Sequence, residues 1–276
     1  MKGITAYVWA YNEEERLPIT LNFLKGFDEI VIIDKSSTDK TADIGRQFGA
    51  KVHTLPYFES HADPVAKPML IDIMNNFEND WAFEVTCSDV YHPDLCKCMH
   101  EIIQDDLYDA VEIPLYRYSM GYVSKYSFYG AITFQRKLHR KDAYDWNITA
   151  LHADPTKNAK RVGRLQPSDP KVAIYHLTHE NLEMVMERHL RYARVEAQAD
   201  RTKGTREEYL ERSWRSILRV VVNYIRKKTY KLGDDGKAQL SMLLMYRCAN
   251  YLNLYFSKEK ENEIHEVYEA FRRGEF

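Results

Sequence analysis

The segment ITAYVWAYNEEERLPITLNFLKGFDEIVIID, residues 4–34, decides the fold of this 276-residue chain. It opens with an apolar run, residues 4–10, and closes with a second, residues 29–34. Unbroken apolar runs are typical of strands that are buried on both faces. Between the two runs, leucines recur at helical spacing, at positions 17, 21 and 24. The segment therefore predicts a strand, a helix and a second strand.

The same alternation continues to about residue 95. The pattern predicts a helix within residues 36–49, a strand over 50–55, a helix over 64–77 and a strand over 81–87. Such β-α-β-α order calls for an α/β fold with a mainly parallel sheet and helices on both faces. In sheets of this kind, ligands bind beyond the carboxyl ends of the strands, so polar residues that follow each strand are the candidates for a site.

The pattern changes in the second half of the chain. Residues 110–150 are rich in Tyr, Arg and short β-like runs, and 172–177 is one further strand-like run. After it the spacing is helical to the end. We therefore expect a domain over residues 1–178 that carries the ligand site and a helical C-terminal region over 179–276.

Composition narrows the classes of function. Apolar residues make up 45% of the chain, enough for a substantial core. Lys and Arg total 39 against 41 Asp and Glu, so no basic field argues for nucleic acid. The chain has no apolar stretch long enough for a membrane span, and its first residues enter a strand-like run at once, which predicts no secretion signal. Four irregularly spaced cysteines favour a cytoplasmic protein with reduced thiols; Cys96 and Cys98 with His100 are a weak metal pattern.

Polar clusters follow the first two strands. Tyr11, Asn12 and Glu14 come after the first strand, and Asp34 ends the second. A tyrosine there can stack on a base or sugar, and the amide and carboxylates can bind a ribose or a base edge. The alternative is that Asn12 and the glutamates only cap the next helix. Residues 37–39 are more simply explained as structural caps.

These residues carry a family resemblance. The segment from Ala10 to Val52 resembles the opening of the inverting family 2 glycosyltransferases: YNEE follows the first strand, DEIVIID forms the second, an S-T-D-x-T motif comes next, and GAKV leads into the third. The resemblance covers roughly the first 95 residues and implies a GT-A (Rossmann-like) fold and a nucleotide-sugar donor. A Rossmann dehydrogenase would need a glycine-rich turn after the first strand, where this chain has Tyr-Asn-Glu.

The resemblance also implies roles for residues farther along. Lys67 stands where the family has a basic residue facing the donor diphosphate, and Arg136 lies in a segment similar to the family's Arg-Leu-x-Arg. The catalytic base, which takes the proton of the acceptor hydroxyl, matches Asp154, with His152 as the alternative. A surface lysine at 67 and a turn-forming Asp-Pro at 154–155 are the non-functional interpretations.

The family's metal motif is incomplete here. Family members end the fourth strand with Asp-x-Asp, whose carboxylates hold Mg²⁺ or Mn²⁺ against the diphosphate. The matching positions are Thr86, Cys87 and Ser88, followed by Asp89, or, with the alignment shifted by one residue, Cys87 to Asp89; either alignment retains one carboxylate. We expect Ser88 and Asp89 to lie against the donor and Asp89, with His176 at the end of the late strand, to hold a weakly bound Mn²⁺ or Mg²⁺. Transfer without metal, with cations neutralising the diphosphate, is the alternative.

The C-terminal third is similar, more loosely, to the branch that adds sugars to lipopolysaccharide core or related surface glycans. An apolar helix bordered by Arg219, Arg226 and Lys227 suits a peripheral contact with the inner face of a membrane; the alternative is that these helices pack on the core or on a second subunit in a homodimer. The resemblance implies transfer of a hexose, most simply from UDP, to a glycan or lipid-linked acceptor. The competing hypotheses are a nucleotide-sugar-binding protein without turnover and, on weaker grounds, a sugar nucleotidyltransferase.

Overall fold

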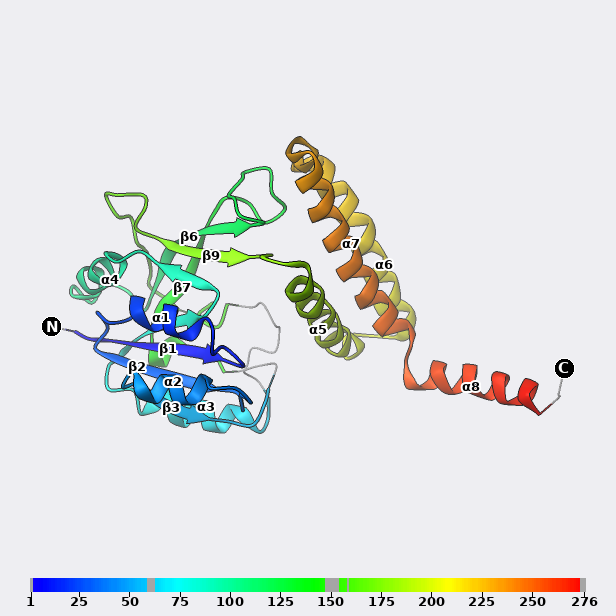
Figure 1. The fold of residues 1–276 in the computed structure, drawn as a ribbon, viewed down its shortest axis with the longest axis horizontal. Helices are drawn as coiled ribbons and strands as arrows, with labels where there is room; N and C mark the ends of the chain where they lie inside the picture. Colours follow the sequence, from blue (N-terminus) through cyan, green and yellow to red (C-terminus); the bar gives the residue numbers. More distant parts are fainter. Residues whose placement is uncertain (1, 59–62, 147–153, 158, 274–276) are drawn as a thin grey trace. The chain divides into compact units, whose positions relative to one another are not determined.

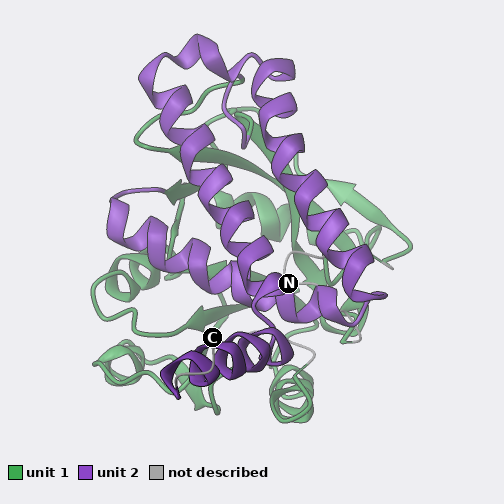
Figure 2. Cartoon of the chain, turned by 90° about the vertical axis from the view of Figure 1, so that its right-hand side faces the viewer, with its two compact units in different colours: residues 1–125, 130–178 green, residues 126–129, 179–276 purple. Residues whose placement is uncertain are grey.

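The computed structural model describes residues 2–58, 63–146, 154–157 and 159–273. The chain divides into two compact units (Figure 2). The first comprises residues 1–125 and 130–178, and the second comprises 126–129 and 179–276. Within the described residues, every helix is too short or too polar to cross a bilayer.

The first unit is built on one curled, mainly parallel sheet (Figure 1). The strand order is β3-β2-β1-β4-β7-β6-β9-β5, and β8 also pairs with β6. Strands β1 to β4 run parallel to one another, whereas β7 is antiparallel to both β4 and β6. The strands span Ile4–Ala10 (β1), Glu29–Asp34 (β2), Lys51–Thr54 (β3), Trp81–Thr86 (β4), Asp89–Tyr91 (β5), Ala110–Ser119 (β6), Ile132–Arg140 (β7), Val162–Arg164 (β8) and Ile174–Thr178 (β9). The predicted α/β class with a mainly parallel sheet is confirmed.

Helices cover both faces of this sheet. On one face, α1 (Leu17–Phe23) and α4 (Leu95–Ile103) bury their leucines and methionine against β1 and β4, and α2 (Thr41–Gln47) adds Ile44. On the other face, α3 (Ala66–Asn75) packs its apolar side on Tyr7, Val31 and Ile33. The strands of the sheet's centre are thus buried on both faces, which is why their sequences are continuous apolar runs.

Strand register places the ends of β1, β2 and β4 side by side. Ala10 pairs with Asp34, and Trp9 pairs with Thr86. Neighbouring parallel strands lie about 4.8 Å apart. The segments that follow these three strands therefore leave the sheet at one edge.

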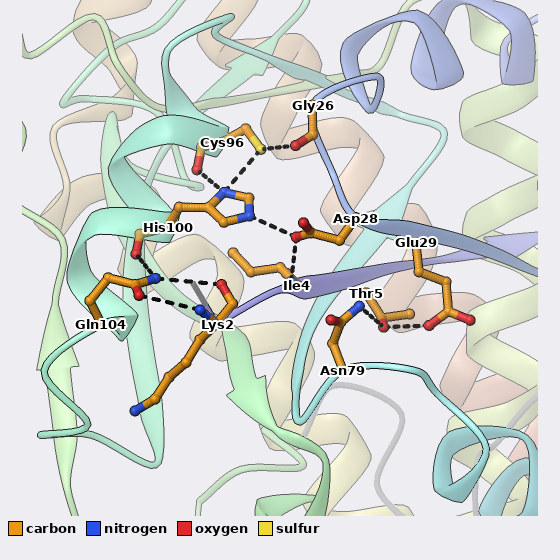
Figure 3. Close-up of polar contacts among 10 residues, drawn as sticks. All are labelled: Lys2, Ile4, Thr5, Gly26, Asp28, Glu29, Asn79, Cys96, His100 and Gln104. Carbon is orange, nitrogen blue, oxygen red and sulfur yellow. Dashed lines mark hydrogen bonds and ion pairs between the residues drawn. The ribbon is translucent and has the colours of Figure 1, made fainter.

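A polar network secures the opposite, amino-terminal edge (Figure 3). Asp28 accepts hydrogen bonds at 2.8 Å from the Ile4 backbone N–H and from His100 Nε2, while His100 Nδ1 lies 2.9 Å from the Cys96 carbonyl oxygen. The Cys96 thiol donates to the Gly26 carbonyl at 3.1 Å. These bonds tie α4 to the start of β1 and β2. In the described part of the chain no three His, Cys, Asp or Glu side chains are grouped as metal ligands, Cys96, Cys98 and His100 included.

The second unit is helical. It contains α5 (Leu182–Arg201), α6 (Arg206–Arg226), α7 (Asp234–Tyr255) and α8 (Lys258–Arg272). Thr205 and Glu208 form a capping box at the start of α6, and Asn181 caps α5. Residues 126–129 join this unit because the Gln239 side chain of α7 accepts hydrogen bonds from Ser127 Oγ and the Phe128 N–H, each at 3.1 Å.

Candidate active site

The segments after β1 and β2 are tied together by side chains predicted to bind the donor. Asn12 has a left-handed backbone, φ 52°, and its Oδ1 accepts from the Thr38 N–H at 2.8 Å. Glu14 Oε2 accepts from the Lys40 N–H at 3.1 Å. The buried Asp34 accepts from the Ser37 N–H at 3.1 Å. These three acceptors hold the segment 37–40 in place, so their structural role is plain, and their contact with a donor stays a prediction.

Tyr11 is placed differently. Its side chain is 37% exposed, and its ring packs edge-on against Tyr57 with the centroids 4.8 Å apart. The ammonium of Lys35 lies 5.5 Å from the Tyr57 ring centroid. An exposed aromatic ring beside a second ring, with a cation nearby, is suited to stacking on a planar base.

Lys67 lies in the first turn of α3, and its backbone N–H donates to the Asp63 carbonyl.

Asp89 is the centre of a buried ionic cluster. Its side chain is fully buried, and Lys137 Nζ lies 2.7 Å from Oδ2. His176, its partner in the β5–β9 register, places Nδ1 2.5 Å from Oδ1. Tyr91 OH donates to Oδ2 at 3.3 Å. Burial alone raises the pKa of Asp89, but the charge of Lys137 and the His176 hydrogen bond outweigh it and hold the pKa far below its usual range.

The donor set at Asp89 does not fit a divalent ion. Both carboxylate oxygens are already engaged, and one of the partners is a cation. The preceding motif positions carry hydroxyls, Thr86 and Ser88, whose Oγ atoms lie 3.3 Å apart. Mg²⁺ and Mn²⁺ favour carboxylate oxygens, and an ammonium at 2.7 Å repels a second cation. Asp89 and His176 are brought together as the metal prediction requires, but the positive charge beside Asp89 is the ammonium of Lys137.

Asp154 forms a second acidic centre. Its Oδ1 accepts from the Thr156 N–H at 2.8 Å and from the Thr156 hydroxyl at 2.7 Å. Its Oδ2 lies 3.3 Å from Arg136 Nη1, and Arg136 Nε lies 3.7 Å from Glu112. The side chain of Asp154 is 39% exposed. An accessible carboxyl group that is held by a turn and an arginine is suited to accept a proton. His152, the alternative base, lies outside the described residues.

Glu84, on β4, links the two acidic centres electrostatically. Burial raises the pKa of Glu84, the charge of Lys137 opposes that effect, and the charges of Asp89 and Asp154 add to it. Tyr7 of β1 is the register partner of Glu84, and its hydroxyl lies 2.9 Å from Nε2 of His139 on β7. Neither Glu84 nor Lys137 is among the residues predicted from the sequence. For Glu84 the available signal was a charged residue inside the otherwise apolar β4, WAFEVT, whereas Lys137 lies among the basic residues of β7 and had no such signal.

Sequence comparison finds short matches to proteins that are named glycosyltransferases. No family model matches the chain. An uncharacterized glycosyltransferase of Rickettsia typhi is 38% identical over 58 residues, which cover 21% of this chain and 20% of that protein. One from Rickettsia bellii is 31% identical over 90 residues, covering 30% of this chain and 27% of that protein. The matches thus span about a fifth to a quarter of these relatives.

A solved structure matches over the whole chain. Residues 1–349 of S. aureus TarS, in complex with UDP-GlcNAc, superpose with a TM-score of 0.51 at 17% identity. The superposition covers 100% of this chain and 93% of that one. The fold is GT-A-like. In such a sheet the edge where β1, β2 and β4 end is where ligands bind, and the candidate side chains after β1 and β2 lie along that edge.

Proposed function

We propose that this protein is a glycosyltransferase that uses a nucleotide-sugar donor. The observation that carries the proposal is the GT-A-like sheet with an accessible carboxylate, Asp154, held by Arg136. The names of the Rickettsia relatives and the UDP-GlcNAc bound to TarS agree with it. We further infer that the donor is a UDP-hexose and that the acceptor is a glycan or a lipid-linked saccharide of a surface-polysaccharide or lipopolysaccharide pathway.

The chemistry follows from the roles of these side chains. In an inverting transfer, the acceptor oxygen attacks the sugar C1 as the bond from C1 to the diphosphate oxygen breaks on the opposite side. Asp154 takes the proton of the acceptor hydroxyl, and the electron pair of the broken bond leaves with the diphosphate. Lys67 and Arg136 are the cations we assign to that negative charge. Tyr11 stacks on the base. No step requires an ion at Asp89, which instead stabilises this part of the sheet.

The experiment measures donor binding and turnover separately. UDP-sugars at about 100-fold over Kd should stabilise the fold by about 2.7 kcal/mol, seen as a rise in Tm. Donor hydrolysis and transfer are then measured for the wild type, for Asp154→Asn and for Asp105→Asn, an exposed aspartate that serves as the control. We expect Asp154→Asn to bind the donor and lose turnover. If no UDP-sugar raises Tm, the donor assignment is wrong.

One specific observation favours a second candidate function. The hydroxyls of Thr86 and Ser88 stand where the family has carboxylates, so the chain could bind a nucleotide sugar without transferring it. In that case UDP-sugars raise Tm in the wild type and in Asp154→Asn alike, and neither protein releases UDP.

A further inference from the structure

Helix α6 carries large apolar side chains on its exposed side as well as on its buried side. On its inner face it buries Tyr209, Val220 and Ser213, whose hydroxyl donates to Asn250 Oδ1 of α7 at 2.8 Å. On its outer face it exposes large apolar side chains, each between 42% and 61% accessible: Trp214, Leu218, Val221, Val222 and Ile225. We call these five residues the apolar stripe. A helix that only served to pack on its neighbours would place them inward.

The stripe is continuous along one side of the helix. Its members are spaced four, three, one and three residues apart, which keeps them on one face. From Trp214 to Ile225 it is about 17 Å long at 1.5 Å per residue. Single exposed apolar side chains are ordinary, whereas a contiguous row of this kind marks an interaction surface.

Basic residues border the stripe. Arg215, Arg219 and Arg226 line a shallow groove of about 410 Å³ together with Leu218, Val222 and Asn223. Residues 212–233 contain seven Lys or Arg and not one Asp or Glu. Arg215 is paired with Glu211 at 2.6 Å. Within the described residues, Arg219 and Arg226 have no carboxylate partner.

We propose that the apolar stripe docks on an anionic lipid surface. A basic amphipathic helix lies in the plane of a bilayer with its apolar side chains about 5–10 Å into the headgroup boundary. The flanking guanidinium groups then meet lipid phosphates, for which their planar donors are suited. This surface belongs to the second unit, so the proposal goes beyond the donor chemistry and does not depend on it.

Charge argues against a second copy of the chain as the occupant. In a twofold dimer through this face, the stripe would meet itself and the arginine row would face an identical row. Like charges brought together in a desolvated interface are destabilising. The chain offers an internal comparison: α8 exposes Val267, Tyr268 and Phe271, but acidic residues such as Glu266 and Glu269 lie beside them. The basic residues near that face, Arg272 and Lys260, are paired with Glu269 and Glu263, so it has no excess of positive charge to attract anionic lipid.

The experiment is co-sedimentation of the full chain with vesicles. One set is phosphatidylcholine alone, and the other contains about 30% phosphatidylglycerol, whose surface potential attracts basic segments. We expect binding to the anionic vesicles only, and weaker binding when the salt concentration rises from about 0.05 M to about 0.5 M. The emission of Trp214 should shift to the blue on binding, and Trp214→Phe should remove that shift.

Matched variants separate charge from apolar contact. Arg219→Gln with Arg226→Gln should weaken binding roughly 30-fold, and Lys237→Gln with Lys258→Gln should change it little although it removes the same charge. Leu218→Ser with Ile225→Ser should cost about tenfold, whereas Val267→Ser with Phe271→Ser in α8 should be neutral. All the positions are exposed, so helicity by circular dichroism should remain unchanged.

Two results would overturn the proposal. The first is binding to anionic vesicles that is equally strong in the α6 variants and their controls. The second is an absence of vesicle binding, whether or not sedimentation velocity detects a dimer that Leu218→Ser with Ile225→Ser dissociates. Neither result bears on donor binding, because the Tm test with UDP-sugars uses no lipid.

Discussion

Replacing Lys137 with Met should destabilise the first unit by about 3 kcal/mol. The substitution keeps the unbranched stem of the side chain but removes the ammonium that lies 2.7 Å from the fully buried Asp89. Loss of one partner from a buried ion pair typically costs about 3–5 kcal/mol, since the other charge is left uncompensated. We take the lower end because His176 still donates to Asp89 at 2.5 Å.

The assay is urea unfolding followed by tryptophan fluorescence in a Trp214→Phe background, so that the signal comes from the first unit alone. The matched control is Lys141→Met. Lys141 lies 3.7 Å from Asp80, whose side chain is 76% exposed, and pairs of this kind contribute about 0–1 kcal/mol. Adding Asp89→Asn to Lys137→Met should recover part of the loss, because no buried charge then remains unpaired.

The pH dependence supplies a second check. In the wild type, the depressed pKa of Asp89 contributes stability that is present above the carboxyl's unfolded value and is lost only in strong acid. Without Lys137, burial raises the pKa of Asp89, so the carboxyl takes up a proton at a milder pH. The difference between wild type and Lys137→Met should therefore shrink as the pH falls. A loss no larger than that of Lys141→Met, at every pH, would refute the reasoning.

Three further predictions concern single groups. Asp154→Asn should lower kcat about 10²- to 10⁴-fold, which is the usual contribution of a general base. The donor Kd, measured by titration, should be unchanged. Burial lowers the pKa of His139 to about 4, so the folded state binds fewer protons than the unfolded state, and about 3 kcal/mol should be lost between about pH 6.5 and 4; urea unfolding of His139→Gln across that range should lack this slope. The Cys96 and Asp28 hydrogen bonds, against the effect of burial, raise the pKa of His100 to about 9. Its stabilisation is present below about pH 6.5 and is lost towards pH 9; solvent screening reduces it to about 1 kcal/mol, and His100→Gln should have a flatter profile by thermal unfolding.

Local pattern predicted the apolar strands of the sheet, missed the short strands β5 and β8, and failed where distant segments meet. The strands at 4–10 and 29–34 were predicted with their observed bounds, because apolar runs buried on both faces have little ambiguity. The helix expected within 36–49 begins only at Thr41. The Thr38 and Lys40 amides are bound by the side chains of Asn12 and Glu14, which follow β1 and are 26 residues away in sequence. No periodicity within 36–49 could have shown that.

The same reason explains what was missed in the candidate site. Asp89 and His176 were expected together as metal ligands, and they do lie in contact. The contact of Lys137 with Asp89 was not expected, because the two residues are 48 positions apart in sequence. Lys137 also lies in a run of basic residues, which is typical of an exposed strand. Only the pairing of β4 with β7 brings its ammonium to the end of β4.

In the proposed enzyme, the net charge of the side chains near the end of β4 affects how well a diphosphate binds there. Two carboxylates, Asp89 and Asp154, lie within electrostatic range of a third, Glu84, and Lys137 and Arg136 supply two cations. With all three ionised, the cluster is negative and opposes a diphosphate. The raised pKa of Glu84 reduces that negative charge, because a Glu84 carboxyl that holds a proton is neutral. The buried ammonium of Lys137 and the raised pKa of Glu84 both act in the direction in which a metal motif acts by adding a cation: they reduce the negative charge at the end of β4, which favours binding of the donor's phosphates by Arg136 and Lys67 in the proposed enzyme.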